Sequence, residues 1–287
     1  MTAKSWIVRG ATAVLGLTLL LALVGVVRFR SNASRAHRVP ERSLPAASTA
    51  AELARGRHLA TSLAGCTECH GSDLAGKTMD DNALLRLTAP NLTRGRGSVV
   101  LSYTERDWQR AILHGIDPSG RNLLVMPSKE LRTFSDHDVT AIIAYVKSVP
   151  PVDSEVPKSR VSLLGQVALG LAGEQLWSAN TIAHDESRAG KLTPSGPTVA
   201  HGEYLLGVCK GCHGYDLKGG LQHGPDAPPS ADISAAAMGG WTRDQLARLL
   251  REGKRRDGSE ISAAMPWRAL SAVTDEELTA MWLALRE

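Results

Sequence analysis

Two short motifs of cysteine and histidine carry the residue types and spacing that could do chemistry. They read Cys66-Thr67-Glu68-Cys69-His70 and Cys209-Lys210-Gly211-Cys212-His213. Cys-x-x-Cys-His is the attachment signature of c-type haem. Two cysteines at this spacing project from one side of a helical turn, where each sulfur can form a thioether with a vinyl group and the adjacent histidine can coordinate iron. We therefore expect two covalent haem c groups, held by Cys66, Cys69 and His70 and by Cys209, Cys212 and His213.

Other chemistries use the same cysteine spacing. A zinc site would need the two cysteine pairs brought together and would leave His70 and His213 without a role. A thioredoxin-like redox pair, a disulfide and an iron–sulfur site are the remaining alternatives. Two independent matches to the full motif favour haem over all of these.

Each iron needs a sixth ligand from elsewhere in the chain. Met126 and Met265 are the candidates, because each precedes a proline and holds the same place after its motif. A methionine thioether opposite histidine raises the reduction potential and leaves no open position for a substrate. The alternative role is to fill a gap in a core, as most methionines do. The less favoured ligands are three other methionines and four histidines: Met79, Met238, Met281, His114, His137, His201 and His223.

The two motifs belong to an internal repeat. His70 and Met126 are 56 residues apart, and His213 and Met265 are 52 residues apart. A haem motif followed by Met-Pro at nearly the same distance, found twice, indicates two copies of one domain. We therefore expect four segments: an N-terminal anchor with a basic linker (1–51), a first haem domain (52–150), an interdomain linker (151–198) and a second haem domain (199–287).

Both copies are predicted to be mainly helical. Ser135 and Thr274 open the closing segment of each copy as N-caps, and Glu277 completes a capping box with Thr274. Helices are also predicted over residues 104–113 and 242–251, where apolar residues recur at helical spacing after a threonine. No strand or hairpin pattern stands out in either copy, so the expected fold class is all-α.

An apolar run near the N-terminus predicts a membrane anchor. Residues 10–27 are uninterrupted, and with the apolar residues before Arg9 the run reaches about 21 residues, enough for one helical span. It ends in Arg28-Phe29-Arg30 rather than in a small-residue cleavage site, which favours an uncleaved anchor over a signal peptide. Residues 1–51 hold seven basic and one acidic residue, so the basic excess flanks the membrane and does not indicate a nucleic-acid partner.

The charges around the anchor and the haem motifs predict opposite orientations. More arginines follow the apolar run than precede it, and the positive-inside rule would place the rest of the chain in the cytoplasm. Haem of this type is attached outside the inner membrane, and long domains can be translocated against a local charge bias. We therefore expect a single-pass protein of the bacterial inner membrane with its haem domains in the periplasm.

A second apolar stretch lies in the predicted linker. It runs from Leu163 to Leu171 and on to Trp177, and it is too short to span a bilayer. A helix packed between the two domains is the favoured interpretation. A helix lying in the membrane interface is the alternative.

Together these features resemble the class I c-type cytochromes, in which a helix leads into Cys-x-x-Cys-His and a loop methionine precedes the last helix. The resemblance implies two tandem class I cytochrome c domains behind a transmembrane helix. It also implies that a proline carbonyl orients each iron-binding histidine. Pro90 fits this role in the first copy, and Pro229 fits it in the second, with Pro225 and Pro228 as competitors.

The same resemblance implies a close crossing of the first and last helices of each domain. In that family the two helices meet at a small residue. The crossing would place Gly56 against Tyr145 and Gly202 against the region of Trp282.

The arrangement as a whole looks like the cytochrome subunits of membrane dehydrogenases for alcohols or sugar acids, and like dihaem subunits of terminal oxidases. Residues 103–108, the turn at 115–117 and Ser-Val-Pro-Pro at 148–151 carry this resemblance. We therefore expect an electron carrier or electron-transfer subunit of a respiratory or photosynthetic chain, rather than an enzyme. It would relay single electrons between membrane-bound redox partners through His/Met-ligated haems.

Two alternatives remain open at this stage. A dihaem oxidoreductase, such as a thiosulfate dehydrogenase or a peroxidase, would need one haem with a cysteine, a histidine or a vacancy at the distal position. The basic run Lys254-Arg255-Arg256 could dock an acidic partner, or it could be a solvated loop.

Overall fold

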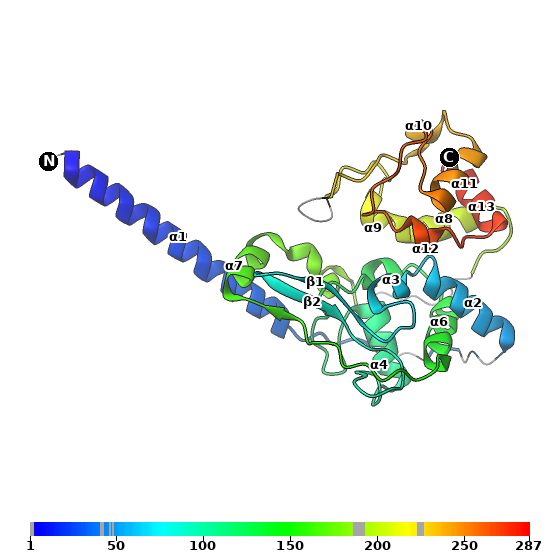
Figure 1. Cartoon of the computed structure of the whole chain (residues 1–287), viewed down its shortest axis with the longest axis horizontal. Helices are drawn as coiled ribbons and strands as arrows, with labels where there is room; N and C mark the ends of the chain where they lie inside the picture. Colours follow the sequence, from blue (N-terminus) through cyan, green and yellow to red (C-terminus); the bar gives the residue numbers. More distant parts are fainter. Residues whose placement is uncertain (1–2, 41–42, 46, 48, 186–192, 223–226) are drawn as a thin grey trace.

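The computed structural model describes residues 3–40, 43–45, 47, 49–185, 193–222 and 227–287. His223 and Pro225, named above as alternatives, lie outside these residues. One long N-terminal helix leads into two mainly helical bodies (Figure 1). We call residues 49–185 the first unit and residues 193–287 the second unit.

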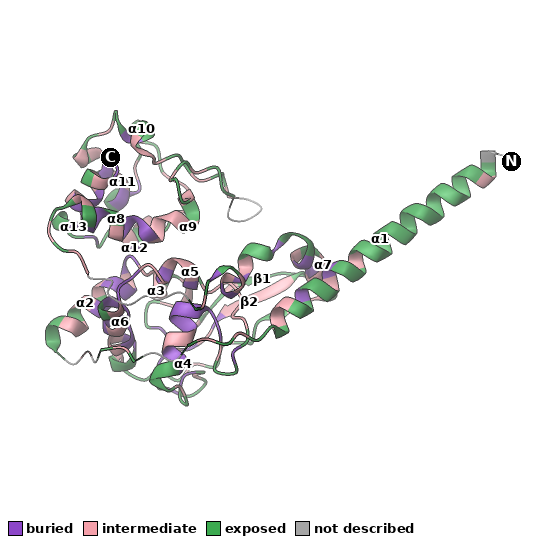
Figure 2. Cartoon of the chain, turned by 180° about the vertical axis from the view of Figure 1, so that it is seen from behind, coloured by how far each residue is buried: buried purple, intermediate pink, exposed green. Residues whose placement is uncertain are grey.

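The N-terminal helix α1 (Ala3–Ser34) projects away from both units (Figure 1). Almost its whole length is exposed (Figure 2), and the exposed side chains include Leu15, Leu19 and Leu23, each about 60% accessible. The helix is long and apolar enough to cross a membrane. Its apolar surface therefore fits a membrane anchor, as predicted.

The first unit is built around two crossing helices, α2 (Ala50–Thr61) and α6 (Asp136–Ser148). Thr49 starts α2 with a capping box, and Ser135 starts α6 as the predicted N-cap. The shorter helical elements between them are α3 (Cys66–His70), α4 (Glu105–Gln109), the π-helical turn η1 (Arg110–His114) and α5 (Ser128–Leu131). The helix predicted over 104–113 is therefore confirmed as α4 and η1.

The second unit repeats this plan, with α8 (Val199–Leu206) crossing α13 (Asp275–Ala284). Thr274 and Glu277 form the predicted capping box, and Thr242 caps a helix that matches the predicted one. The other elements are η4 (Gly207–Cys209), α9 (Lys210–His213), α10 (Ala235–Met238), α11 (Arg243–Glu252) and α12 (Trp267–Leu270).

Backbone details after each haem motif are also repeated. Leu74 and Leu217 both have a φ of 60°. The amide of Gly76 donates to the carbonyl of His70, and the amide of Gly219 donates to that of His213, both at 2.8 Å. A non-glycine residue with positive φ is uncommon, so its recurrence at the same place indicates the same local structure in both units.

Both helix crossings occur at the predicted glycines. A Cβ on Gly56 would overlap the carbonyl of Ala141, and a Cβ on Gly202 would overlap that of Ala280. The atoms nearest to the two glycines are therefore backbone atoms of Ala141, one turn before Tyr145, and of Ala280, two residues before Trp282. Only glycine allows the helices to approach this closely.

A small antiparallel sheet in the first unit was not predicted. It consists of β1 (Lys77–Asp81), β2 (Leu85–Ala89) and β3 (Arg160–Val161), in the order β1-β2-β3. Asn82 forms the turn, because its Oδ1 accepts the amides of Leu84 at 2.8 Å and Leu85 at 3.1 Å. The strands are short, β1 is largely exposed and β3 comes from far along the chain, so no local alternation signals them. The strict all-α prediction is therefore wrong, although the chain is mostly helical.

The described part of the predicted linker contains one strand and three helical elements. It holds β3, α7 (Leu163–Ala172), η2 (Glu174–Leu176) and η3 (Ser178–Thr181). Helix α7 packs on α1, where a Cβ on Gly25 would come within 2.6 Å of the carbonyl of Val167. The favoured expectation of a helix between the two domains is thus wrong, and the domain boundaries themselves stay a prediction.

Gly56→Ala tests the close crossing of α2 and α6. The new Cβ must push the helices apart, and we expect the free energy of unfolding to fall by roughly 1–3 kcal/mol, measured by chemical denaturation. Gly239→Ala is the control, because a Cβ there would meet only ordinary contacts at 3.5 Å. Equal stability of the two variants would contradict the crossing.

Candidate functional site

The first haem motif forms the single-turn helix α3. It follows Gly65, which is in the left-handed conformation, and it stops at Gly71, whose φ is 85°. Cys66 and Cys69 are free thiols on this turn. Burial raises the pKa of Cys66 to about 12 and also raises that of Cys69. Cys66 packs against the hydrophobic core, and both thiols are partly buried.

The ring of His70 is held by the backbone. Its Nδ1 donates a hydrogen bond to the carbonyl oxygen of Pro90, which lies 2.8 Å away. Pro90 therefore takes the role predicted for it. Burial lowers the pKa of His70, which keeps the imidazole neutral. Nε2 of a neutral ring with its proton on Nδ1 is the atom that can coordinate iron.

The second haem motif repeats this arrangement on η4 and α9. Cys209 and Cys212 are free thiols, and burial raises the pKa of Cys209 to about 12. His213 donates from Nδ1 to the carbonyl of Ala231 at 2.7 Å. The prediction of Pro229 is therefore wrong. Any backbone carbonyl can accept this hydrogen bond, so no proline is needed. The amide of Gly220 donates to the carbonyl of Ser230 at 2.8 Å, and this pairing brings the next carbonyl, that of Ala231, to the ring.

Met126 lies in a strained loop that other segments hold in place. Its neighbour Val125 has a φ of 66°, which is unfavourable for a β-branched residue. The amide of Val125 donates to the carbonyl of Leu176 at 2.8 Å, and the hydroxyl of Ser178 donates to that of Met126 at 2.6 Å. Backbone strain of this kind is typical of functional positions.

The two Met-Pro turns share their shape. The amide of Ser128 donates to the carbonyl of Met126, and the amide of Trp267 donates to that of Met265, both at 2.8 Å. Both methionines are half-buried and pack on the same hydrophobic core as Cys66 and Cys209. The structure thus brings both methionines to the hydrophobic cluster that both haem motifs adjoin, and iron ligation by these methionines stays a prediction.

The less favoured ligands have other surroundings. Met238 and Met281 are buried in the core of the second unit, and Met79 lies on β1. The ring of His114 contacts that of His184 at 3.0 Å, and His201 contacts the carbonyl of Gly196 at 2.8 Å. Another histidine, His137, lies 3.5 Å from a carboxylate oxygen of Glu52. These groups are occupied by contacts within the protein.

The residues present fit haem c and do not fit a zinc site. Among the described residues, which include all four cysteines, no three side chains of histidine, cysteine, aspartate or glutamate are grouped to hold a metal ion. Each unit instead offers two thiols on one turn, a histidine fixed through Nδ1 and a thioether. This is the donor set for covalent attachment and axial ligation of haem.

Comparison with known proteins agrees with this chemistry. Residues 51–146 match the family model described as cytochrome c oxidase, cbb3-type, subunit III. These residues form a cytochrome c domain. The match covers α2, the first haem motif, the Met126 loop and most of α6. The predicted resemblance to c-type cytochromes is thereby confirmed.

The chain is also similar to cytochrome subunits of dehydrogenases. It is 26% identical over 235 residues to the fructose dehydrogenase cytochrome subunit of Gluconobacter japonicus, which covers 75% of this chain and 48% of that protein. It is 25% identical over 263 residues to the gluconate 2-dehydrogenase cytochrome c subunit of Pantoea cypripedii, with 79% and 57% covered. The cytochrome c subunit of the quinone-dependent alcohol dehydrogenase of Gluconobacter oxydans is 27% identical over 242 residues, with 74% and 49% covered. The chain thus spans about half the length of these relatives.

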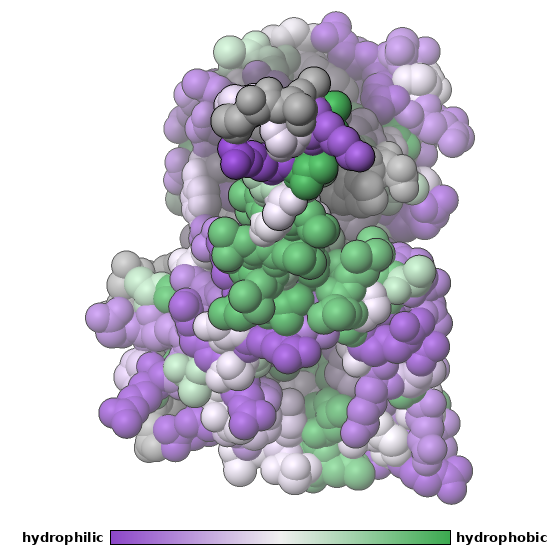
Figure 3. Space-filling view, turned by 90° about the vertical axis from the view of Figure 1, so that its left-hand side faces the viewer, coloured by the Kyte–Doolittle hydropathy of each residue, from purple (hydrophilic) through white to green (hydrophobic). Residues whose placement is uncertain are grey.

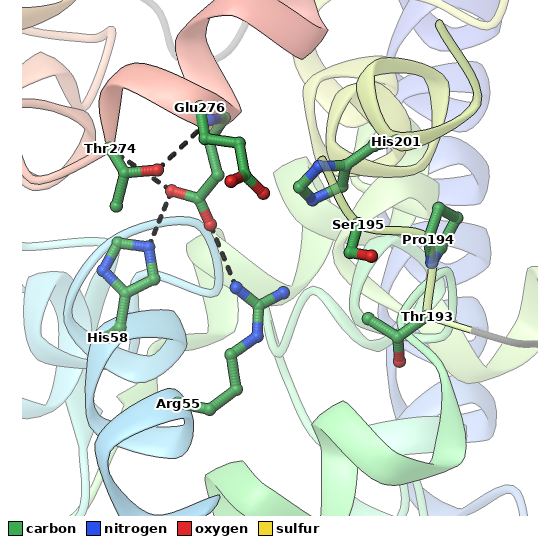
Figure 4. A pocket seen from close by; sticks show the side chains of 9 residues that line it. Arg55, His58, Thr193, Pro194, Ser195, His201, Thr274 and Glu276 are labelled. Atoms are coloured by element: carbon green, nitrogen blue, oxygen red, sulfur yellow. Dashed lines mark hydrogen bonds and ion pairs between the residues drawn. The ribbon is translucent and has the colours of Figure 1, made fainter. Parts of the chain in front are cut away.

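A charged network joins the cytochrome c domain to the second unit (Figure 4). The guanidinium of Arg55 bonds Asp138 and Glu277, each at 3.0 Å, and His58 Nε2 lies 2.8 Å from Glu277. The hydroxyl of Tyr204 donates to Asp138 at 2.7 Å. The network borders a cavity of about 460 Å³ between the units, and neither haem motif lines it. Its role is to hold the two units together.

Sequence reasoning missed this network, although a signal was present. Asp138 and Glu277 are 139 residues apart, the same offset as Met126 and Met265. Each stands at the third position of the closing helix of its unit. A carboxylate is common there as part of a capping box, so neither acid stands out in the sequence. Two repeat-related acids and one arginine on the first helix could have indicated a link between the copies.

The first unit also contacts the second haem motif directly. Helix α5, which follows Met126-Pro127, faces α9 and η4. A Cβ on Gly211 would come within 2.5 Å of Glu130, and one on Gly207 within 2.8 Å of Thr133. The ammonium group of Lys129 lies 4.9 Å from the ring centre of Tyr215. The loop that carries Met126 is therefore next to the second haem motif.

Glu277→Gln tests the network through its pH dependence. Hydrogen bonds from His58 and Thr274 and the charge of Arg55 outweigh burial and lower the pKa of Glu277 to about 2. A carboxylate with a lowered pKa stabilises the fold above its ordinary pKa of about 4.5, and this stability is lost as the pH falls toward 2. We expect Glu277→Gln to lower the free energy of unfolding by roughly 1–3 kcal/mol at pH 7. The variant should also lose less stability than the wild type as the pH falls from 4.5 toward 2.

The measurement is denaturant unfolding at pH 7, 4 and 3. Glu276→Gln is the matched control, because this neighbouring carboxylate is exposed and accepts the amide of Gly196 at 2.8 Å rather than bonding Arg55 or His58. An unaltered profile in Glu277→Gln would refute the stabilising role of the network.

Proposed function

We propose that the chain is an electron-transfer subunit or carrier that relays single electrons through two covalently bound haem c groups. The observation that carries this proposal is the repeat of one complete donor set. Each unit has two thiols on one turn, a histidine fixed by a backbone carbonyl and a Met-Pro turn of the same shape. The second unit is, on this proposal, a second class I cytochrome c domain.

The residues of the chain have defined roles in this function. Cys66, Cys69, Cys209 and Cys212 hold the cofactors, and His70 and His213 bind iron through Nε2. Met126 and Met265 are the distal ligands, which favour the reduced form and leave no position for a substrate. When bound, haem c supplies an iron that accepts and releases one electron at a time. This ligand set favours a carrier over the alternative of a dihaem oxidoreductase.

The partner is, on this proposal, a membrane-bound dehydrogenase. The three relatives named above are cytochrome subunits of dehydrogenases for fructose, gluconate and alcohol. α1 would hold the chain in a bacterial inner membrane, with the haem domains in the periplasm where a dehydrogenase could reach them. A carrier needs a partner within reach of one haem domain, and the anchor confines both proteins to one membrane.

Met126→Ala and Met265→Ala test the axial ligands. Loss of the thioether should lower the potential of one haem by on the order of 100 mV and should allow carbon monoxide to bind that haem. Spectroscopic redox titration and carbon monoxide difference spectra of the purified protein measure both effects. Met79→Ala is the control methionine on β1. If both variants keep the wild-type potentials, the ligand assignment is wrong.

The number of haems can be counted directly. Intact-mass spectrometry of protein made in a host with c-type haem maturation should show two covalent haems per chain. The double variant Cys209→Ala/Cys212→Ala should retain one haem, and Cys66→Ala/Cys69→Ala should retain the other. A wild-type chain that carries one haem or none would overturn the dihaem proposal.

A further inference from the structure

Helix α7 has an apolar face that the described residues leave exposed. The helix contains no charged residue, and Gln166 is its one polar side chain. Leu163 and Leu164 are 64% and 69% accessible, and Leu171 is 42% accessible. The opposite face, with Gly165 and Gly170, is buried. A water-exposed helix normally carries polar residues on its outer face, so this surface is unusual for an aqueous environment.

Contacts with α1 place α7 at the end of the apolar run. A Cβ on Gly170 would overlap the carbonyl of Gly25, which lies in the last part of that run. Just beyond it, Arg30 Nε donates to Gln166 Oε1 at 2.9 Å, and Arg28 lies 3.9 Å from Glu174. Since the anchor passes from apolar to charged residues here, α7 lies at the depth of the boundary between lipid and water.

The turn between β1 and β2 extends the same surface. The carbonyl of Leu84 accepts both the amide and the hydroxyl of Ser162, at 2.9 and 3.0 Å, directly before α7 begins. The side chain of Leu84 is 39% accessible. Figure 3 views the molecule from the N-terminal end of α1 and shows apolar side chains gathered on this side. We call Leu84, Leu163, Leu164 and Leu171 the leucine patch.

We propose that the leucine patch inserts into the acyl region of the bilayer that α1 crosses, so that α7 is an interfacial membrane helix. The occupant is lipid because α7 is bound to α1 at the depth where lipid surrounds the anchor. The ten residues of α7 are too few to span the membrane. Ser162 caps the first turn through the amide of Gly165, and the amide of Gly173 donates to the carbonyl of Leu169. The exposed side chains of the helix are apolar and suited to face the acyl chains.

This contact would give the chain a second attachment to the membrane. One helix alone leaves the attached units free to tilt, whereas α1 and α7 together fix the first unit relative to the bilayer. The proposal concerns the anchor and is independent of the number of haems and of their ligands.

The test is the depth of spin labels in the full-length, haem-loaded protein reconstituted into vesicles of phosphatidylcholine and phosphatidylglycerol. Leu164→Cys and Leu171→Cys each carry a nitroxide, and unsubstituted protein treated in the same way gives the background. Leu101→Cys is the matched control, because this leucine is 62% accessible and stands four residues before α4 (Glu105–Gln109), a helix that lies away from α7 in Figure 1. Oxygen collects in the acyl region, and a neutral nickel complex stays in water.

We expect the ratio of oxygen to nickel accessibility at positions 164 and 171 to exceed that at position 101 by roughly an order of magnitude. Equal ratios at the three positions would overturn the proposal. Low access to both reagents at 164 and 171 would also overturn it, since protein and not lipid would then cover the patch. In that case, dipolar broadening that disappears on dilution with unlabelled chain would identify a second copy as the occupant.

Discussion

The arrangement of the two units depends on one arginine between two buried carboxylates. Asp138 and Glu277 are 0% and 3% accessible, and a buried carboxylate is strongly unfavourable unless it is paired and hydrogen-bonded. Arg55 satisfies both at once, with the fork geometry that suits two carboxylates. Because the two acids lie in the first turns of the closing helices of different units, compensating their charge also fixes one closing helix against the other. The pairing therefore joins the stability of each unit to their relative position.

The hydrophobic core continues across this junction. Leu131 and Phe134 of the first unit belong to one buried cluster with Leu205 and Leu206 of the second. The ring of Phe134 meets that of Tyr204 at 6.0 Å, and Tyr204 in turn bonds Asp138. The same packing holds α5 against the second haem motif. On the proposed function, a close contact between the Met126 loop and the second motif would suit a relay between two haems, because the units need not move to bring the motifs together.

The sequence predicted the parts of the structure that have local or repeated signals. Ser135 and Thr274 mark their helices because N-caps are chemically specific, and the glycine crossings and the Pro90 carbonyl followed from the family resemblance. Features that depend on distant partners were missed. The strand β3 pairs with β2, about 75 residues earlier, Arg55 reaches across 222 residues to Glu277, and backbone pairing alone selects the carbonyl of Ala231. The domain boundaries, the number of haems and the methionine ligands stay predictions.

The contacts of α7 also bear on the charges that follow the anchor. Counted as free charges, the arginines after the apolar run of α1 oppose a periplasmic location. The structure gives two of them another role, because Arg30 bonds Gln166 and Arg28 pairs with Glu174. The first contact attaches α7 to α1, and the second attaches the following turn η2 to α1, so these arginines have a structural role on either side of the membrane. Their number is therefore a weaker indicator of topology than in a chain whose flanking arginines make no tertiary contact, and the conflict with covalent haem attachment outside the membrane is reduced.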